Sequence, residues 1–337
     1  METFVPPAHD GTLRVLGRSD LATLDLAPAD VIEAVTAAVR ALADGTSVNP
    51  RKLSVQPADQ RSVSYAMLGR DGAREVVAIR ASYRHDPHHD RTQLRHFTTL
   101  TLYDDRTGTP IALMDCGRIG SLRTPAVSAV LARECAPPNS RTALLIGTGT
   151  TARQALPMLV TALPELDRLL LFGTSPDGIA AVLREFAAHA PGRSVEVLPD
   201  LDALRTAAGE ADIVIATAGP ATPAAVEADW LKPGALAVLV GYGLAPSTFQ
   251  QADRIIATSA AQMADTGTDM AFPDGTLRTA DAELADVLAG SVPGRGSAEE
   301  RILAYNSGLV VTDIAVGALL AEVAAAKGLG TTIPLWS

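Results

Sequence analysis

Residues 142–157 read TALLIGTGTTARQALP, which is an apolar run, a glycine-rich turn and then a segment with helical spacing. The apolar run has the length of a buried strand, and Gly147 and Gly149 stand at its end. A strand that enters a G-x-G-x-x-A turn and then a helix is typical of a dinucleotide-binding βα unit. In such a turn, Gly147 makes the tight bend, Gly149 admits a pyrophosphate close to the backbone, and Ala152 lets the helix pack closely.

The segments before and after this turn have different patterns of apolar and turn-forming residues. After it, strand-like and helix-like segments alternate, from LLLF and DGIAAVLREFAAHA to DIVIATA, ALAVLVG and RIIAT, which predicts a parallel sheet. Before it, the segments 53–57, 62–69, 76–83 and 97–103 are short, alternating or β-branched, and separated by Gly, Asp and Pro. That pattern predicts a mostly antiparallel sheet.

We therefore expect an α/β fold with two domains. The first is a smaller, mainly antiparallel α+β domain for substrate binding and dimerisation, formed by residues 1–124 and completed by a C-terminal helix within 308–337. The second, over residues 125–307, is a Rossmann doubly wound parallel sheet that binds NAD(P). Residues 27–44 are expected to form an amphipathic helix with Asp30 near its start and Gly45 after its end.

Composition excludes several classes of function. The 337-residue chain has a formal charge of −10 and a pI near 5.1, which argues against nucleic-acid binding because phosphate contacts need a basic face. Only Cys116 and Cys135 are present, so no disulfide framework is expected, and a reducing cytoplasm fits. We find neither a signal peptide nor a membrane-spanning run, and expect a cytoplasmic protein without membrane contact.

The end of the second strand bears on which dinucleotide is bound. An NAD-binding domain usually has Asp or Glu there, about 20 residues after the glycine turn, to hold the ribose hydroxyls. Here LLLF is followed by Gly173, Thr174 and Ser175, which offer two hydroxyls and no carboxylate. This favours NADP over NAD, although the arginine expected to clamp a 2′-phosphate is missing after this strand. Arg153 is either a further positive charge for the phosphate or a solvated helix residue.

A second sequence motif, together with this cofactor turn, resembles a known family. The sequence PIALMDCGRIGSLRTPAVSAVLA ends shortly before the TALLI strand, and NPRKLS, ADIVIATA, WLKPGALAVLVG and SGLVVTDIA follow the same pattern over roughly residues 45–330. Together these motifs resemble the ornithine cyclodeaminase/mu-crystallin family. The resemblance implies a homodimer and reactions on amino acids in which hydride moves between the α-carbon and nicotinamide.

The resemblance also implies site residues. The family's substrate carboxylate is held at the positions of Arg51, Arg80 and Arg123. The cofactor is expected along Arg123, Thr124, Gly147, Gly149, Thr150, Thr151, Ala152, Gly173, Thr174, Ser175, Thr217, Ala218, Val240, Gly241, Asn306 and Ser307.

Two departures from the family pattern bear on the reaction. Arg80 stands where many members have a substrate-binding lysine, and Gly243 stands where cyclodeaminases have a catalytic aspartate. Arginine keeps the charge and pairs bidentately with a carboxylate, but it is a poor general acid. Glycine cannot act as a base. The sequence therefore favours imine reduction or amine oxidation over cyclodeamination.

Other reactive side chains carry weaker signals. His85, His88, His89 and His96 crowd one segment with Asp86 and Asp90, but their spacing fits no standard metal site, so a hydrophilic loop and no metal are expected. His85 is the first candidate for a proton donor. Cys116 is expected to be a buried small residue, and Asp313 either faces the nicotinamide or is an ordinary residue of an early helical turn.

The sequence thus predicts an NAD(P)H-dependent oxidoreductase on the C–N bond of a small carboxylate-bearing amine or imine, with specialised amino acid biosynthesis as one setting for it. The alternatives are a cyclodeaminase of ornithine or lysine with relocated acid and base groups, and an NADPH-dependent ligand-binding protein of the mu-crystallin type.

Overall fold

The computed structural model describes residues 11–85 and 95–336, which form two compact units. The first unit contains the chain up to Leu26, Ala37–Gly120 and the chain from Val310 onward. The second unit contains Ala27–Thr36 and Ser121–Leu309. The sequence predicted boundaries at 124/125 and 307/308, whereas these units divide at 120/121 and 309/310, and residues 27–36 belong to the second unit.

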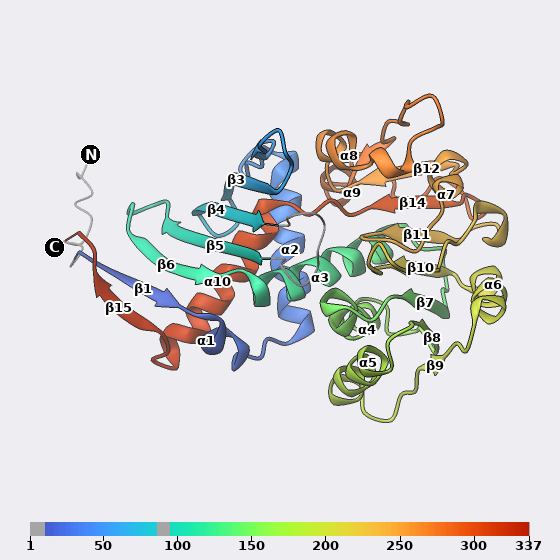
Figure 1. The fold of residues 1–337 in the computed structure, drawn as a ribbon, viewed down its shortest axis with the longest axis horizontal. Coiled ribbons are helices and arrows are strands. Elements are labelled where there is room, and N and C mark those ends of the chain that lie inside the picture. Colours follow the sequence, from blue (N-terminus) through green and yellow to red (C-terminus); the bar gives the residue numbers. More distant parts are fainter. Residues whose placement is uncertain (1–10, 86–94, 337) are drawn as a thin grey trace. The chain divides into compact units, whose positions relative to one another are not determined.

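The second unit is built on an eight-stranded sheet in which every neighbouring pair is parallel (Figure 1). Its strands in spatial order are β13 (Ala282–Glu283), β12 (Arg254–Ala257), β14 (Ile302–Tyr305), β11 (Leu236–Leu239), β10 (Ile213–Ala216), β7 (Thr142–Ile146), β8 (Arg168–Phe172) and β9 (Glu196–Val197). The order reverses direction at β7, which is the position where doubly wound sheets bind ligands. The central strands are continuous apolar runs because helices cover both faces.

The helices of the second unit follow the strands in alternation. Those of regular length are α4 (Thr150–Ala162), α5 (Pro176–His189) and α6 (Leu201–Glu210), and the shorter ones are α7 (Pro246–Gln250), α8 (Ala260–Thr266) and α9 (Leu284–Leu288). One side of the sheet packs on a core that includes Leu144, Val214 and Phe249, all fully buried. The expected Rossmann architecture is confirmed.

The first unit holds a seven-stranded sheet. Its spatial order is β15 (Thr331–Pro334), β1 (Thr12–Leu16), β6 (Pro110–Asp115), β5 (Arg95–Asp104), β4 (Val76–His85), β3 (Ser62–Asp71) and β2 (Leu53–Val55). Only the β1–β6 pair is parallel, which confirms a mainly antiparallel second sheet. Helix α10 (Val310–Ala326) packs across β3, β4 and β5, and Gly69 gives it room, since a Cβ there would collide with Val310.

Four elements differ from the sequence prediction. Helix α2 (Pro28–Ala43) lies where a helix was expected, but α3 (Gly117–Cys135) begins seven residues before the expected start at 124 and contains Pro125. Proline inside a helix removes one N–H donor without ending the helix when the surrounding residues are well packed, and most of this helix is buried. The edge strand β15, its partner β1 and the short helix α1 (Arg18–Ala22) were not predicted, because their few residues carry little periodicity.

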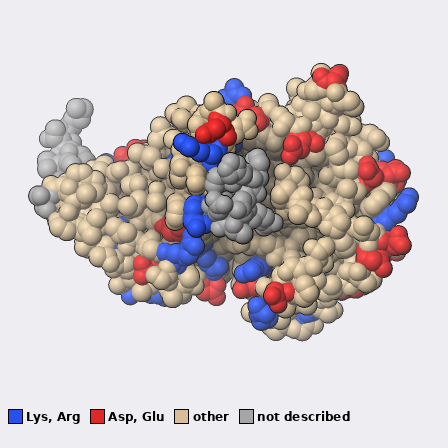
Figure 2. All heavy atoms as spheres, viewed as in Figure 1, with Lys and Arg blue, Asp and Glu red and all other residues tan. Residues whose placement is uncertain are grey.

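Within the described residues, no helix has both the length and the apolar character needed to cross a bilayer. Figure 2 shows acidic and basic side chains on the same face of the molecule, with several basic side chains gathered on the first unit.

Candidate functional site

The cofactor-binding residues expected from the sequence lie together at one edge of the parallel sheet. Except for Arg123 and Thr124, which lie on α3, they belong to the segments that follow five neighbouring strands, whose last residues are Ile146 of β7, Phe172 of β8, Ala216 of β10, Leu239 of β11 and Tyr305 of β14. Parallel strands place all their carboxyl ends on one edge, so these loops meet there.

The turn after β7 has the backbone that a phosphate loop requires. Gly147 has φ +110°, and a Cβ there would lie 2.7 Å from the Ala218 nitrogen, so only glycine fits. Gly149 is the N-cap of α4, and a Cβ at that position would meet no protein atom within 4 Å. The space above Gly149 is therefore open to a ligand.

The N-terminus of α4 also lacks a side-chain cap. By contrast, α5 and α6 are capped by Ser175 and Asp200, whose side chains accept hydrogen bonds from Gly178 and Ala203. Uncapped N–H groups at a helix N-terminus bind anions through hydrogen bonds and the helix dipole. Among the three longer helices α4, α5 and α6, the one that the sequence assigned to the pyrophosphate is thus the one without a side-chain cap.

The loop after β8 is packed against the phosphate loop. Thr148 lies against both Gly173 and Gly178, and a Cβ at either glycine would collide with its side chain. Thr174 is exposed, while the Ser175 hydroxyl accepts the Gly178 N–H at 3.2 Å and keeps its own proton to donate. The two hydroxyls are thus at the expected strand end.

The loops after β10 and β11 are tied to each other and to β7. Thr217 donates through its backbone N–H and through Oγ1 to the Ile146 carbonyl, at 2.8 and 3.0 Å. Ala218 and Tyr242 exchange backbone hydrogen bonds of 3.0 and 2.9 Å, and Gly241 is close enough that a Cβ there would lie 2.7 Å from the Ala218 oxygen. These hydrogen bonds fasten the loops after β10 and β11 to each other and to the end of β7.

A third group joins the end of β14 to α3. The Asn306 side chain donates to the Thr124 carbonyl at 3.1 Å and to Ser128 Oγ at 3.0 Å. Its Oδ1 is buried with no hydrogen-bond partner in the described part of the chain. Gly308, at φ +72°, lies against the Arg123 guanidinium, since a Cβ at Gly308 would lie 3.0 Å from Arg123 Cζ. Arg123, Thr124 and Asn306 are therefore neighbours.

A cavity of about 450 Å³ opens in the second unit beside these loops. It is lined by Leu239, Val240, Gly241, Tyr242, Leu244, Pro246, Thr266, Gly267, Asp269, Met270, Tyr305, Asn306 and Ser307. Four of them were expected to bind cofactor, whereas Tyr242, Asp269, Thr266 and Tyr305 were not identified from the sequence. Two hydrogen bonds connect these four: the Tyr242 hydroxyl donates to Asp269 at 3.4 Å, and Tyr305 and Thr266 share one of 3.0 Å.

These residues fit a dinucleotide. The open space over Gly149 and the uncapped α4 suit a pyrophosphate, and the unpartnered Asn306 Oδ1 can accept a hydrogen bond from a ligand amide. A buried acceptor without a partner costs stability, which is a common sign of a ligand-binding group.

The first unit positions the arginine that replaces the family lysine. Arg80 lies on β4, with 19 % of its side chain exposed, and its Nε is 3.5 Å from Oδ2 of Asp313, which is almost fully buried on α10. A second contact joins Arg80 Nη1 to the Met67 sulfur at 3.3 Å. Arg80 Nε has no hydrogen-bond partner among the described residues. Asp313 is thus a counter-ion of Arg80.

Arg51 and Cys116 occupy different surroundings. Arg51 is exposed and lies just before β2. Cys116 is buried at the end of β6, and burial raises the pKa of its thiol to about 12, so it is not a thiolate nucleophile at neutral pH. The prediction that Cys116 is a buried small residue is confirmed, and both cysteines are free thiols.

The two described histidines near Arg80 point to opposite faces of the sheet. Side chains alternate along a strand, so Arg80, Ser82 and Arg84 share one face of β4 while Tyr83 and His85 share the other. The rings of Tyr83 and His85 are stacked, with their centroids 6.5 Å apart. His85 therefore faces away from Arg80, and the sequence expectation that it donates a proton lacks the geometry it needs. His96 lies on the Arg80 face.

Gly243 is required by the packing around it. Its φ is +129°, and a Cβ there would lie 2.9 Å from Ile146 Cγ2 and 3.4 Å from Ala216 Cβ. An aspartate at this position would be strained and would point into the ends of β7 and β10. The packing around Gly243 therefore leaves no room for a side chain.

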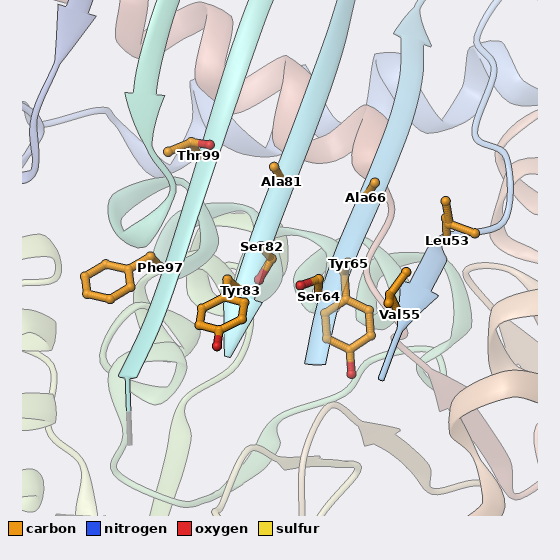
Figure 3. A pocket seen from close by; sticks show the side chains of 10 residues that line it. All are labelled: Leu53, Val55, Ser64, Tyr65, Ala66, Ala81, Ser82, Tyr83, Phe97 and Thr99. Carbon is orange, nitrogen blue, oxygen red and sulfur yellow. The ribbon is translucent and has the colours of Figure 1, made fainter. Parts of the chain in front are cut away.

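The face of the first-unit sheet opposite α10 is apolar and exposed. Leu53, Val55 and Phe97 are 67, 64 and 63 % exposed, and a shallow cavity of about 460 Å³ lies among their neighbours on β2 to β5 (Figure 3). Exposed apolar patches of this kind mark interaction surfaces in soluble proteins.

In the described part of the chain, no three His, Cys, Asp or Glu side chains are grouped as metal ligands. His88, His89, Asp86 and Asp90 of the histidine-rich segment lie outside the described residues.

The description of the matching family model is ornithine cyclodeaminase/mu-crystallin family, and the match covers residues 15–328. The chain belongs to this family. Among curated relatives, the nodulation efficiency protein NfeD of Rhizobium meliloti is 26 % identical, over 95 % of this chain and 98 % of its own length. A Delta(1)-pyrroline-2-carboxylate reductase of Bacillus cereus is 29 % identical over 69 % of this chain and 73 % of its own length.

Solved structures of this ornithine cyclodeaminase/mu-crystallin fold are similar over the whole chain. Delta(1)-pyrroline-2-carboxylate reductase of Thermococcus litoralis, in complex with NADH and L-proline, has a TM-score of 0.79 at 24 % identity, covering 95 % of this chain and 100 % of its own. An archaeal alanine dehydrogenase dimer with bound NAD has a TM-score of 0.77 at 22 % identity, covering 96 % and 99 %. At these identities the likeness is one of fold.

Proposed function

We propose that this protein is an NAD(P)H-dependent oxidoreductase acting on the C–N bond of a small amino or imino acid. The observation that carries the proposal is Arg80, a mostly buried guanidinium whose Nε lies 3.5 Å from Oδ2 of Asp313. A cation in that state is suited to bind a carboxylate, because its planar fork pairs bidentately. Arg51 and Arg123 are the further candidates for binding the substrate anion.

The residues of the second unit supply the cofactor site in this proposal. Bound nicotinamide dinucleotide would exchange a hydride with the α-carbon of the substrate. Gly149 and the first N–H groups of α4 would hold the pyrophosphate, while Asn306 and the loops after β10 and β11 would orient the nicotinamide end. Relatives named as reductases and dehydrogenases of imino and amino acids support this assignment.

The geometry favours reduction or dehydrogenation over cyclodeamination. A cyclodeaminase needs a base near the amine, and the position where the family supplies it is Gly243, which has no room for a side chain. Release of ammonia from ornithine or lysine by the purified protein would favour the cyclodeaminase instead. Tight NADPH binding with no turnover of any imine or amine would favour a ligand-binding protein of the mu-crystallin type.

An activity screen tests the proposal. The purified protein is incubated with NADPH or NADH and with cyclic imino acids, or with 2-oxo acids plus ammonia or an amine, and loss of nicotinamide absorbance is followed. We expect oxidation that requires both the imine and its carboxylate. Equal rates with a matched imine that lacks the carboxylate would contradict the role given to Arg80.

We further propose that NADP(H) is preferred, because the end of β8 offers Thr174 and Ser175 and no carboxylate. Thr174→Asp is expected to weaken NADPH binding by about tenfold, or ~1.4 kcal/mol, through repulsion of the 2′-phosphate, and to leave NADH binding unchanged or tighter. Fluorescence titrations with both cofactors measure this. Thr174→Asn keeps the size without the charge and serves as the control, and an equal loss for NADPH and NADH would contradict the preference.

We propose that the apolar face of β2 to β5 forms a homodimer interface, which the family resemblance implied and the exposed Val55 and Phe97 support. Phe97→Glu is expected to weaken the dimer by at least 100-fold, because a buried unpaired charge costs several kcal/mol. Light scattering after size-exclusion chromatography gives the mass. Leu201→Glu, on an exposed position of the second unit, is the control. A Phe97→Glu protein that stays dimeric would place the interface elsewhere.

A further inference from the structure

A small polar cluster lies beside Arg80 on the face of the sheet that α10 covers. Ser82 Oγ is 3.0 Å from His96 Nε2 and 3.0 Å from Thr98 Oγ1, and Thr98 Oγ1 is 3.3 Å from the same His96 nitrogen. Ser82 is two residues from Arg80 on β4, so both side chains point to one face, and cross-strand pairing brings Thr98 opposite Ser82. Three groups that can pass protons are thus joined next to the anion-binding arginine.

The cluster runs from the surface inward. His96 is exposed as a residue, whereas Ser82 is buried, with 6 % of its surface accessible. An imidazole that reaches water can regain a proton from solvent, and a buried hydroxyl can pass a proton on without admitting water to the substrate. The exposed imidazole of His96 and the buried hydroxyl of Ser82 are therefore arranged as a short proton relay from solvent to the interior.

We propose that His96 and Ser82 deliver the proton to the substrate nitrogen in the reduction of a C=N bond, an inference that rests on the proposed function. The C=N carbon receives a hydride from the reduced nicotinamide, and the π electron pair moves to nitrogen. That nitrogen takes the hydroxyl proton of Ser82, while the Ser82 oxygen takes the proton of His96 Nε2. The imidazole is left neutral and regains a proton from water, and in amine oxidation every transfer runs in reverse.

The charges around His96 support this assignment. Burial, then the positive charges of Arg80 and Arg84, lower the pKa of His96 from its usual value. A lower pKa makes the imidazolium a stronger acid, although less of it is present at neutral pH. Among the other charged or titratable groups in the described part of this face, Asp313 pairs with Arg80 from α10, and Cys116 lies buried at the end of β6.

The relay makes a specific prediction for kinetics. His96→Gln is expected to lower kcat for imine reduction by about 100-fold or more, which is the usual worth of a general acid. In the wild type, kcat for reduction falls as pH rises through the pKa of His96, since the protonated form is the donor. In the variant this dependence disappears. Cofactor affinity and the thermal unfolding temperature serve as checks on folding.

Two further variants keep the test decisive. Ser82→Ala retains His96 but breaks the relay, so kcat is expected to fall by a similar factor even if His96→Gln does not fold. His85→Gln removes a histidine from the opposite face of β4 and is expected to retain wild-type kcat and pH dependence. If the wild type shows no imine turnover, the proposed function fails. If the wild type turns over, and either His96→Gln keeps its kcat and pH profile or Ser82→Ala keeps its kcat, the relay is overturned.

Discussion

Arg80→Gln is expected to raise KM for the imino acid far more than it changes cofactor affinity. Removing one member of a desolvated charge pair costs about 2–5 kcal/mol, which corresponds to a loss of roughly 30-fold to several thousand-fold in kcat/KM. The reason is that the proposed function assigns the substrate carboxylate to Arg80, a mostly buried guanidinium on β4. Steady-state kinetics over a range of imino acid concentrations, with a separate cofactor titration, measure the effect.

The same substitution has a structural consequence that must be separated from binding. Asp313 is almost fully buried and would lose its ion pair with Arg80, and breaking a buried ion pair by removing one member destabilises a protein by about 3–5 kcal/mol. In the double variant Arg80→Gln/Asp313→Asn both charges are gone, so the free energy of unfolding is expected to recover while KM stays high. Recovery of KM together with stability would show that Arg80 has only a structural role. Arg80→Lys is expected to fall between the wild type and Arg80→Gln.

Gly149→Ala is expected to weaken binding of NADPH and NADH by roughly 30-fold to 100-fold, or about 2–3 kcal/mol, while the unfolding temperature stays nearly unchanged. The reason is that a Cβ at Gly149 meets no protein atom and stands only in the space above the N-terminus of α4. A methyl group there keeps a pyrophosphate from the N–H donors. Fluorescence titration and thermal unfolding are the two measurements.

Gly147→Ala is the informative companion. It combines a positive φ with a Cβ position 2.7 Å from the Ala218 nitrogen, so it is expected to destabilise the fold as well as weaken cofactor binding. The contrast between loss of binding alone at Gly149 and loss of both at Gly147 is specific to a phosphate loop. Unchanged cofactor affinity in Gly149→Ala would remove this loop from the cofactor site.

The cofactor half of the site was accessible from the sequence because its signals are local. A strand, two glycines and a helix follow one another within residues 142–157, and the other expected residues, apart from Arg123 and Thr124 on α3, directly follow apolar strands. Since parallel strands end on one edge, the chain order alone brings these loops together. The sequence did not show Asp269 or Thr266 because neither follows a recognisable strand end.

The substrate half depended on contacts that no local pattern contains. The partnership of Arg80 with Asp313 joins β4 to a helix near the end of the chain, and the sequence left the role of Asp313 open. The choice between His85 and His96 depended on which face each occupies. That is set by the pairing of β4 with β5, and a shift of one residue would exchange the faces.

In the proposed reaction, hydride passes between nicotinamide and the α-carbon of a carboxylate-bearing substrate. The most direct measurement uses NADPH carrying deuterium at the transferable position of the nicotinamide ring, a cyclic imino acid as substrate, and mass spectrometry of the product. We expect an amino acid with one deuterium on its α-carbon, and at least about 30-fold less labelled product from Arg80→Gln under the same limiting substrate. Product without deuterium, or labelled product formed equally well by Arg80→Gln, would contradict the proposed reaction.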